Sequence, residues 1–292
     1  MNLLSRFRSS PAPAPDFSQD PVFSRFDRWR GIAPAGMDVD FLGRRTDATF
    51  VEGWADEERM RERAATPPYP IASEETFEWL MLLSSVLEAK DRFVMAELGA
   101  GYGRWIVGAA CALRRARPHL PFKLIGVEAE PQHFAWMRKH FEDNGIDWRE
   151  HTLIHAAVAG SRRTVSFTKG LDPHVHWGQT IVDVPAEWAA PMQAITLADA
   201  LETVDLVDLV DMDIQGAELE VIEGSQDILC RKVRRVHIGT HSAKLERGLR
   251  RVFRRLGWQS IWDWPGRTVN RTPYGRLAFN DGAQTWVNPR LT

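Results

Sequence analysis

From residue 93 onward, short apolar runs alternate with segments whose apolar residues recur at helical spacing. The apolar runs predict strands at residues 93–98, 123–127, 152–158, 206–213, 235–239 and 260–264, with a further candidate at 285–287. The intervening segments predict helices at residues 103–116, 131–143, 216–229 and 243–256. This alternation is typical of a parallel sheet covered by helices. The pattern therefore predicts an α/β fold of the Rossmann-like, doubly wound kind, with helices on both faces of the sheet.

Residues 1–70 show no such alternation. They contain a PAPAP run at residues 11–15 and end in the breaker cluster PPYP at residues 67–70, where we place a boundary. Ser73 is the expected N-cap of a helix that follows. We thus expect an N-terminal extension, residues 1–70, that is a lid over the site or an oligomerisation arm, and a main domain at residues 71–292.

The stretch from 159 to 194 is an interruption within the main domain. It offers one strand-like piece, residues 164–167, and then a cluster of His174, His176 and Trp177. Ligands of open α/β sheets bind beyond the carboxyl ends of the strands. An insertion that leaves from there is well placed to shape a substrate site, so these three side chains are predicted to bind the acceptor.

Composition narrows the class of protein. The 292 residues are 44% apolar and 26% charged, with a formal net charge of −2, which argues against disorder and against a general nucleic-acid binder. Two cysteines build no disulfide framework, and the apolar runs are too short to span a bilayer. We expect a cytoplasmic protein with a small-molecule partner, without nucleic acid or membrane, and with homo-oligomerisation left open.

A glycine-rich turn follows the first predicted strand. Residues 97–103 read ELGAGYG and open a predicted helix, whose N-terminus attracts negative charge. In dinucleotide-binding loops the third glycine follows the second by three positions, but here Gly103 follows Gly101 by two positions and Arg104 stands at the dinucleotide position. The spacing disfavours an NAD-dependent oxidoreductase, which remains an alternative.

The second predicted strand ends in an acid, Glu128, which is placed to accept hydrogen bonds from two ribose hydroxyls. The loop and this acid together resemble the first two motifs of class I S-adenosylmethionine-dependent methyltransferases. The resemblance implies that Glu97 holds the methionine ammonium, that Glu128 holds the ribose, and that the adenine lies near Ala157 and Val158. The backbone that would surround the cofactor's methionine and ribose belongs to Gly99, Ala100, Gly101, Tyr102 and Gly103.

The later motifs resemble those of the FkbM family of methyltransferases. They read ITLADAL at residues 195–201, VDL at 204–206 and DMDIQGAELEVIEG at 211–224. Two positions depart from the family pattern: Asp211 stands where lysine is usual and Gln215 where glutamate is usual. The resemblance implies methyl transfer to an oxygen, commonly on a saccharide or a polyketide-type natural product.

Transfer to an alcohol needs a group that takes its proton. Asp213 and His241 follow neighbouring predicted strands, so we expect one to be the base and the other to orient it or the acceptor. Alternatively, Asp211 and Asp213 would hold Mg²⁺ in a metal-dependent O-methyltransferase. Trp262 and Trp264 could stack on an acceptor ring.

One alternative is a protein that is not an enzyme. The departures at Asp211 and Gln215 also fit a catalytically idle nucleoside-binding or assembly module that kept the fold.

Overall fold

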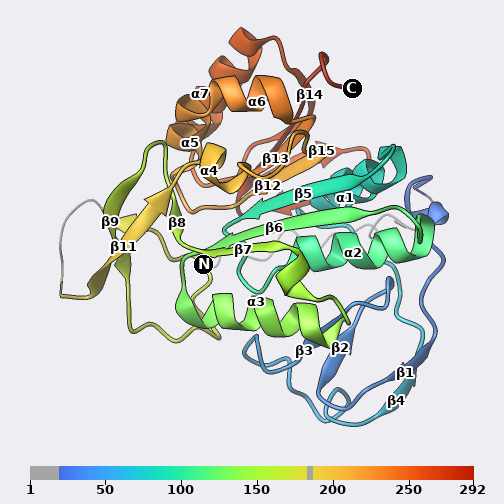
Figure 1. The fold of residues 1–292 in the computed structure, drawn as a ribbon. Helices are drawn as coiled ribbons and strands as arrows, with labels where there is room; N and C mark the ends of the chain where they lie inside the picture. The colour runs from blue at the N-terminus through green and yellow to red at the C-terminus, as the bar shows by residue number, and fades with distance from the viewer. Residues whose placement is uncertain (1–19, 183–186) are drawn as a thin grey trace, which may run out of the picture.

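The computed structural model describes residues 20–182 and 187–292 and is built around a seven-stranded sheet (Figure 1). The strand order is β14-β17-β13-β12-β5-β6-β7. β17 runs antiparallel to both of its neighbours, and the other strands are parallel to one another. Its strands are β5 (Phe93–Leu98), β6 (Phe122–Glu128), β7 (Thr152–His155), β12 (Leu209–Met212), β13 (Arg235–Thr240), β14 (Gln259–Trp264) and β17 (Gly282–Val287). The predicted Rossmann-like α/β class is confirmed.

Helices cover both faces of this sheet, as predicted (Figure 1). On one face lie α1 (Thr76–Glu88), α2 (Arg104–Ala116) and α3 (Pro131–Asp143), and on the other lie α4 (Leu197–Ala200), α5 (Glu218–Gly224), α6 (Gln226–Lys232) and α7 (Ala243–Leu256). The side chains of β5 alternate between the two layers: Phe93 and Met95 belong to the core under α1 and α2, whereas Val94 and Ala96 belong to the core under α5 to α7. Alternation of this kind buries both sheet faces.

Two helices end where the sequence predicts. α3 matches the expected range 131–143, and α7 matches 243–256. Ser242 caps α7, since its hydroxyl accepts a hydrogen bond from the backbone N–H of Leu245 at 3.2 Å. Gly257 ends the helix in the left-handed conformation at φ +77°.

Two other helix predictions were partly wrong. The helix expected at 216–229 is broken at Ser225 into α5 and α6. Next to the break, Gly224 has low helix propensity and packs so closely on Gly160 that a Cβ would stand 2.4 Å from the Gly160 carbonyl oxygen. The N-cap of α1 is Glu75 and not Ser73.

The insertion at 159–194 is largely β-structure. β9 (Arg163–Thr168), β10 (Ile181–Val182) and β11 (Ala189–Ile195) form a second sheet with β8 (Ala157–Val158). The strand predicted at 152–158 is therefore two strands, since the chain leaves the main sheet after β7 and pairs with β11 instead. Of the other strands in this sheet, the sequence indicated only the part of β9 at residues 164–167.

Residues 20–70 pack onto α1 and α2. They form the 3₁₀ turn η2 (Phe23–Arg25) and two short antiparallel pairs, β1 (Gly31–Ala33) with β4 (Arg63–Ala65), and β2 (Met37–Val39) with β3 (Arg45–Asp47). The rings of Phe41 and Trp79 lie 5.2 Å apart, edge to face. The described part of the extension thus shares the core of the main sheet. The PAPAP run lies outside the described residues.

The C-terminal region adds a hairpin that the sequence did not indicate, β15 (Thr268–Thr272) with β16 (Gly275–Phe279). The 3₁₀ turn η3 (Trp148–Glu150) precedes β7. Trp262 and Trp264 pack on Phe77 of α1, with ring centroids 5.1 and 5.3 Å apart, and neither lines the cavity described below. Their predicted role in stacking on an acceptor was wrong. Nowhere in the described ranges does a helix have the length and apolar character needed to cross a membrane.

Candidate functional site

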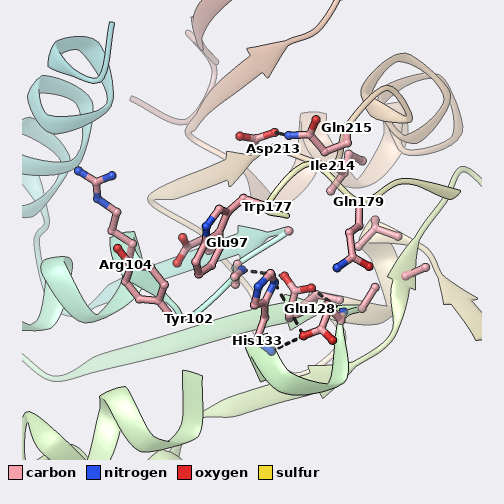
Figure 2. Close-up of a pocket in the computed structure, with 18 of the residues that line it drawn as sticks. Glu97, Tyr102, Arg104, Glu128, His133, Trp177, Gln179, Asp213, Ile214 and Gln215 are labelled. Atoms are coloured by element: carbon pink, nitrogen blue, oxygen red, sulfur yellow. Dashed lines mark hydrogen bonds and ion pairs between the residues drawn. The ribbon is translucent and has the colours of Figure 1, made fainter. Parts of the chain in front are cut away.

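A cavity of about 360 Å³ opens at the carboxyl ends of the central strands (Figure 2). Its walls come from the segments that follow β5, β6, β7 and β12, and its volume falls within the usual range for small-molecule sites. The insertion and the N-terminal extension close it from outside, through Phe167, Trp177, Gln179, Thr180 and Ile181, and through Val51 and Trp54.

The glycine-rich turn forms the inner wall of the cavity. Gly99 has φ +75°, and a Cβ there would stand 1.9 Å from the carbonyl oxygen of Asp213. Gly103, also at φ +75°, is the N-cap of α2. The predicted cofactor-loop residues Ala100, Gly101 and Tyr102 line the cavity together with Gly99, whereas Gly103 lies behind them.

Glu97 lines the cavity but already has partners on α2. Its carboxylate accepts hydrogen bonds from the backbone N–H groups of Trp105 at 3.3 Å and Ile106 at 2.9 Å. Burial raises the pKa of Glu97 to about 8, and the two N–H donors limit that rise. This carboxyl group therefore joins the first strand to the start of α2, beside the position where the sequence predicts an ammonium contact.

Glu128 joins two loops. Its Oε2 accepts a hydrogen bond from the Gly101 N–H at 2.7 Å, and its Oε1 accepts one from the Glu130 N–H at 2.6 Å. Burial raises the pKa of Glu128 to about 7, against the effect of these donors. The glycine-rich turn and the acid that the sequence pairs with it are thus in direct contact (Figure 2).

Small apolar side chains line the end of the cavity beyond Glu128. Ala157, the predicted adenine contact, lies there with Ala156 and Val158, and Phe167 and Ile181 of the insertion complete the wall. An apolar wall of this kind suits a nucleobase.

Trp177 covers the glycine-rich turn. Its ring stacks on His133 of α3 with centroids 4.2 Å apart and planes 2° apart (Figure 2). The backbone before it is tied down on both sides, because the ring of His133 hydrogen-bonds to the Pro173 carbonyl at 2.8 Å and the ring of His174 to the Thr49 carbonyl at 2.7 Å.

The predicted acceptor group is therefore divided. Trp177 lines the cavity, but neither His174 nor His176 does. The bond to Thr49 turns His174 toward the N-terminal extension, and His176 is exposed. We accordingly correct the expectation that all three side chains face the acceptor.

Asp213 and His241 do meet, as their strand positions predict. The Asp213 Oδ1 lies 3.2 Å from the Nε2 of His241 and accepts a hydrogen bond from the Gln215 amide at 2.8 Å. The other ring nitrogen of His241 contacts the buried carboxylate of Glu218 at 2.9 Å. Burial would lower the pKa of His241, but the two carboxylates raise it to about 10. His241 is therefore an imidazolium at neutral pH.

The side chains of Asp211 and Asp213 have different surroundings. Asp213 is half exposed at the cavity rim, whereas Asp211 is 5% exposed and lies among Glu78 and His237. Both aspartates line the cavity.

Sequence reasoning missed the contributions of Val51, Trp54 and Glu218. The first two lie in a segment without periodicity, so no pattern marks them. Glu218 could have been predicted from the sequence. It is an acid in the first turn of the helix after Asp213, which places it within reach of the end of the next strand.

Comparisons with known proteins agree on one family. A family model described as "Methyltransferase FkbM domain" matches residues 122–257. A protein of Jannaschia sp. (strain CCS1), described as "Putative methyltransferase", is 32% identical over 224 residues, which are 73% of this chain and 79% of that protein.

Solved structures give more distant similarities. The precorrin-6y C5,15-methyltransferase of Geobacter metallireducens GS-15 matches with a TM-score of 0.42 at 14% identity, covering 72% of this chain and 85% of its own. The TrmK protein of M. capricolum, in complex with S-adenosyl-homocysteine, matches with a TM-score of 0.38 at 9% identity, covering 71% and 67%.

Proposed function

The chain belongs to the FkbM methyltransferase family, and from that premise we propose that it is an S-adenosylmethionine-dependent O-methyltransferase. Its acceptor is a hydroxyl group of a small molecule, of the saccharide or natural-product kind. The cavity at the strand ends is the site of both substrates.

The cavity fits the cofactor on three grounds. Gly99 leaves backbone exposed where a Cβ would clash, Glu128 offers a carboxylate to vicinal hydroxyls, and Ala157 belongs to an apolar wall. Glu97 would face the methionine ammonium. The cofactor, when bound, supplies a methyl group on a sulfonium, which leaves the protein to orient the acceptor and to take its proton.

Asp213 is the proposed base. Gln215 and His241 both contact its Oδ1, whereas its Oδ2 has no hydrogen-bond partner within residues 20–182 and 187–292. This free oxygen belongs to a residue of the cavity wall and can accept the proton of a hydroxyl group. The single observation that carries the assignment is this one-sided engagement of the Asp213 carboxylate.

His241 is then a positioning residue. An imidazolium with a pKa of about 10 has no free lone pair at neutral pH, so it cannot be the base. Glu218, fully buried, holds one side of the ring, and the other side is directed at Asp213. His241 therefore fixes the position of the Asp213 carboxylate. Of the two roles that the sequence left open, we therefore propose the base for Asp213 and the orienting role for His241.

The Asp213→Asn variant tests the base. The amide keeps the shape but cannot take a proton, so release of S-adenosylhomocysteine at saturating acceptor should fall about 10²- to 10⁴-fold. Binding of S-adenosylhomocysteine, measured by calorimetry, should stay within about twofold. The exposed Asp205→Asn variant is the matched control and should keep full activity.

Two results would count against the proposal. Unchanged turnover in Asp213→Asn would remove Asp213 from catalysis. Tight binding of S-adenosylhomocysteine without its release in a broad screen of hydroxylated acceptors would favour the idle nucleoside-binding module.

A further inference from the structure

A second cluster of ionisable side chains lies under the floor of the cavity. It consists of Glu78 from α1, Asp211 from β12 and His237 from β13. One carboxylate oxygen of each acid and one ring nitrogen of the histidine all lie within 4.8 Å of one another. Three elements distant in sequence thus place three potential ligand atoms at one point.

The two carboxyl groups have no counter-charge of their own. Asp211 is 5% exposed, and neither it nor Glu78 has a hydrogen bond or an ion pair among the described residues. The nearby guanidinium of Arg104 is engaged in a two-pronged pair with Glu75, at 2.6 Å for each contact. Burial, together with neighbouring carboxylates, raises the pKa of both groups well above the usual range. An unpaired buried carboxyl such as that of Asp211 is costly, and the half-buried carboxyl of Glu78 lies beside it without a partner of its own.

The imidazole ring of His237 can offer a nitrogen lone pair to a metal ion. It is 2% exposed, and burial lowers its pKa to about 3, so the ring is neutral. Its Nδ1 is 2.7 Å from the hydroxyl oxygen of Thr285. When Nδ1 donates its proton there, the other ring nitrogen carries a lone pair. Histidine ligands of metals are commonly oriented by such a bond.

We propose that Glu78, Asp211 and His237 bind a divalent first-row transition metal ion. Two carboxylates and a neutral imidazole form a mixed oxygen and nitrogen donor set, which suits ions of the Mn²⁺ to Zn²⁺ series. Ligand atoms about 2.1 Å from such an ion stand about 3 to 4 Å from one another, so small side-chain rotations close the observed spacing. Asp211 also lines the cavity, so the cluster adjoins the cavity wall.

The neighbouring cluster of Asp213, Glu218 and His241 is different in kind. There the imidazolium of His241 already lies between the two carboxylates and neutralises part of their charge. A metal ion would have to displace that proton. The two clusters therefore make a matched comparison within one protein.

The position of the ion indicates a use. A cation beside Asp211 lies next to the rim where Asp213 would take a proton, and a metal ion lowers the pKa of a hydroxyl group that approaches it. This use rests on the proposed function, but metal binding itself does not, and the experiment measures binding without cofactor or acceptor.

The test is a titration of chelator-treated protein with Mn²⁺, followed by electron paramagnetic resonance. The wild type should bind one equivalent, with a rise in melting temperature as Mn²⁺ is added. Asp211→Asn and Glu78→Gln should each weaken binding more than about 100-fold, since ligands matter at least as much as the groups that orient them. Asp213→Asn should bind as the wild type does.

Other outcomes overturn the proposal. Absence of Mn²⁺ binding in the wild type, with a higher melting temperature for metal-free Asp211→Asn, would mean that the two carboxyls share a proton instead. Binding that is lost in Asp213→Asn but kept in Asp211→Asn would place the ion in the other cluster. Mn²⁺ binding by a wild-type protein that transfers no methyl group to any hydroxylated acceptor would count against the proposed function alone.

Discussion

Glu128 shows how one carboxylate serves two purposes at the residue scale. Its two oxygens accept hydrogen bonds from Gly101 and Glu130, which holds the glycine-rich turn against the end of β6. Each carboxylate oxygen can accept more than one hydrogen bond, so ribose hydroxyls can add to these contacts. The carboxylate that braces the turn is thus the one that would hold the ribose.

Removal of the charge at Glu128 should weaken cofactor binding. Hydrogen bonds to a charged group contribute about 1.5–3 kcal/mol, so Glu128→Gln should bind S-adenosylhomocysteine about 10- to 100-fold more weakly. Isothermal titration calorimetry measures this directly. The exposed Glu150→Gln variant is the control, and equal affinities for the two variants would contradict the role of Glu128.

The affinity should also depend on pH. The pKa of free Glu128 is about 7, and hydroxyl donors favour the carboxylate, so the bound state has a lower pKa. Affinity for S-adenosylhomocysteine should therefore rise from pH 5.5 to about 7, by up to tenfold per pH unit.

Glu128→Gln should flatten the rise between pH 5.5 and about 7, and a rise that continues above pH 7 should report Glu97, whose pKa is about 8. Identical profiles in wild type and variant would refute this assignment. The stability of the fold should depend on pH in the opposite direction. Because burial raises the pKa of Glu128, the contribution of this residue to stability is present below about pH 4.5 and is lost as pH rises to about 7.

At the scale of elements, periodicity identifies what is regular and misses what is set by distant contacts. α3 and α7 were predictable because their caps and apolar faces are local. The second sheet was not, since β10 has two residues and β11 pairs with strands far along the chain. Asp213 and His241 could be paired from their strand ends, whereas the true direction of His174 depends on Thr49, 125 residues away.

The glycine-rich turn allows a sharp test of local geometry. Gly99 and Gly145 both have positive φ, +75° and +62°, but only Gly99 has an atom in the path of a Cβ. Gly145→Ala should cost about 1 kcal/mol from backbone conformation alone. Gly99→Ala adds a clash with the Asp213 backbone and should cost several kcal/mol more, or displace the turn and abolish cofactor binding.

Denaturant unfolding of both variants, with calorimetry of S-adenosylhomocysteine, measures the difference. Equal stability and equal binding for the two variants would show that the turn does not need the close contact with Asp213.

At the scale of the whole molecule, the N-terminal extension is integrated with the sheet. Phe41 is 1% exposed and packs on Trp79 of α1, and Val51 and Trp54 reach the cavity. The segment that the sequence separates at residue 70 therefore shares a core with the main domain and contributes to the site. Its service as a lid or an oligomerisation arm stays a prediction.

Loss of Phe41 should destabilise the entire chain. A buried Phe→Ala change costs about 3–5 kcal/mol, and a shared core transmits this to one cooperative transition. Ile32→Ala is the control in the same segment, since Ile32 is 55% exposed, and it should change stability by less than about 0.5 kcal/mol. Two separate unfolding transitions, with only the smaller one affected by Phe41→Ala, would indicate an independent extension.

A crystal structure of the protein grown with S-adenosylhomocysteine tests the central claim most directly. We predict density for the ligand in the cavity at the ends of β5 and β6, with its ribose hydroxyls on Glu128, its adenine beside Ala157 and its homocysteine end toward Glu97. Density for the ligand at another place, or a cavity that stays empty at saturating ligand, would contradict the account.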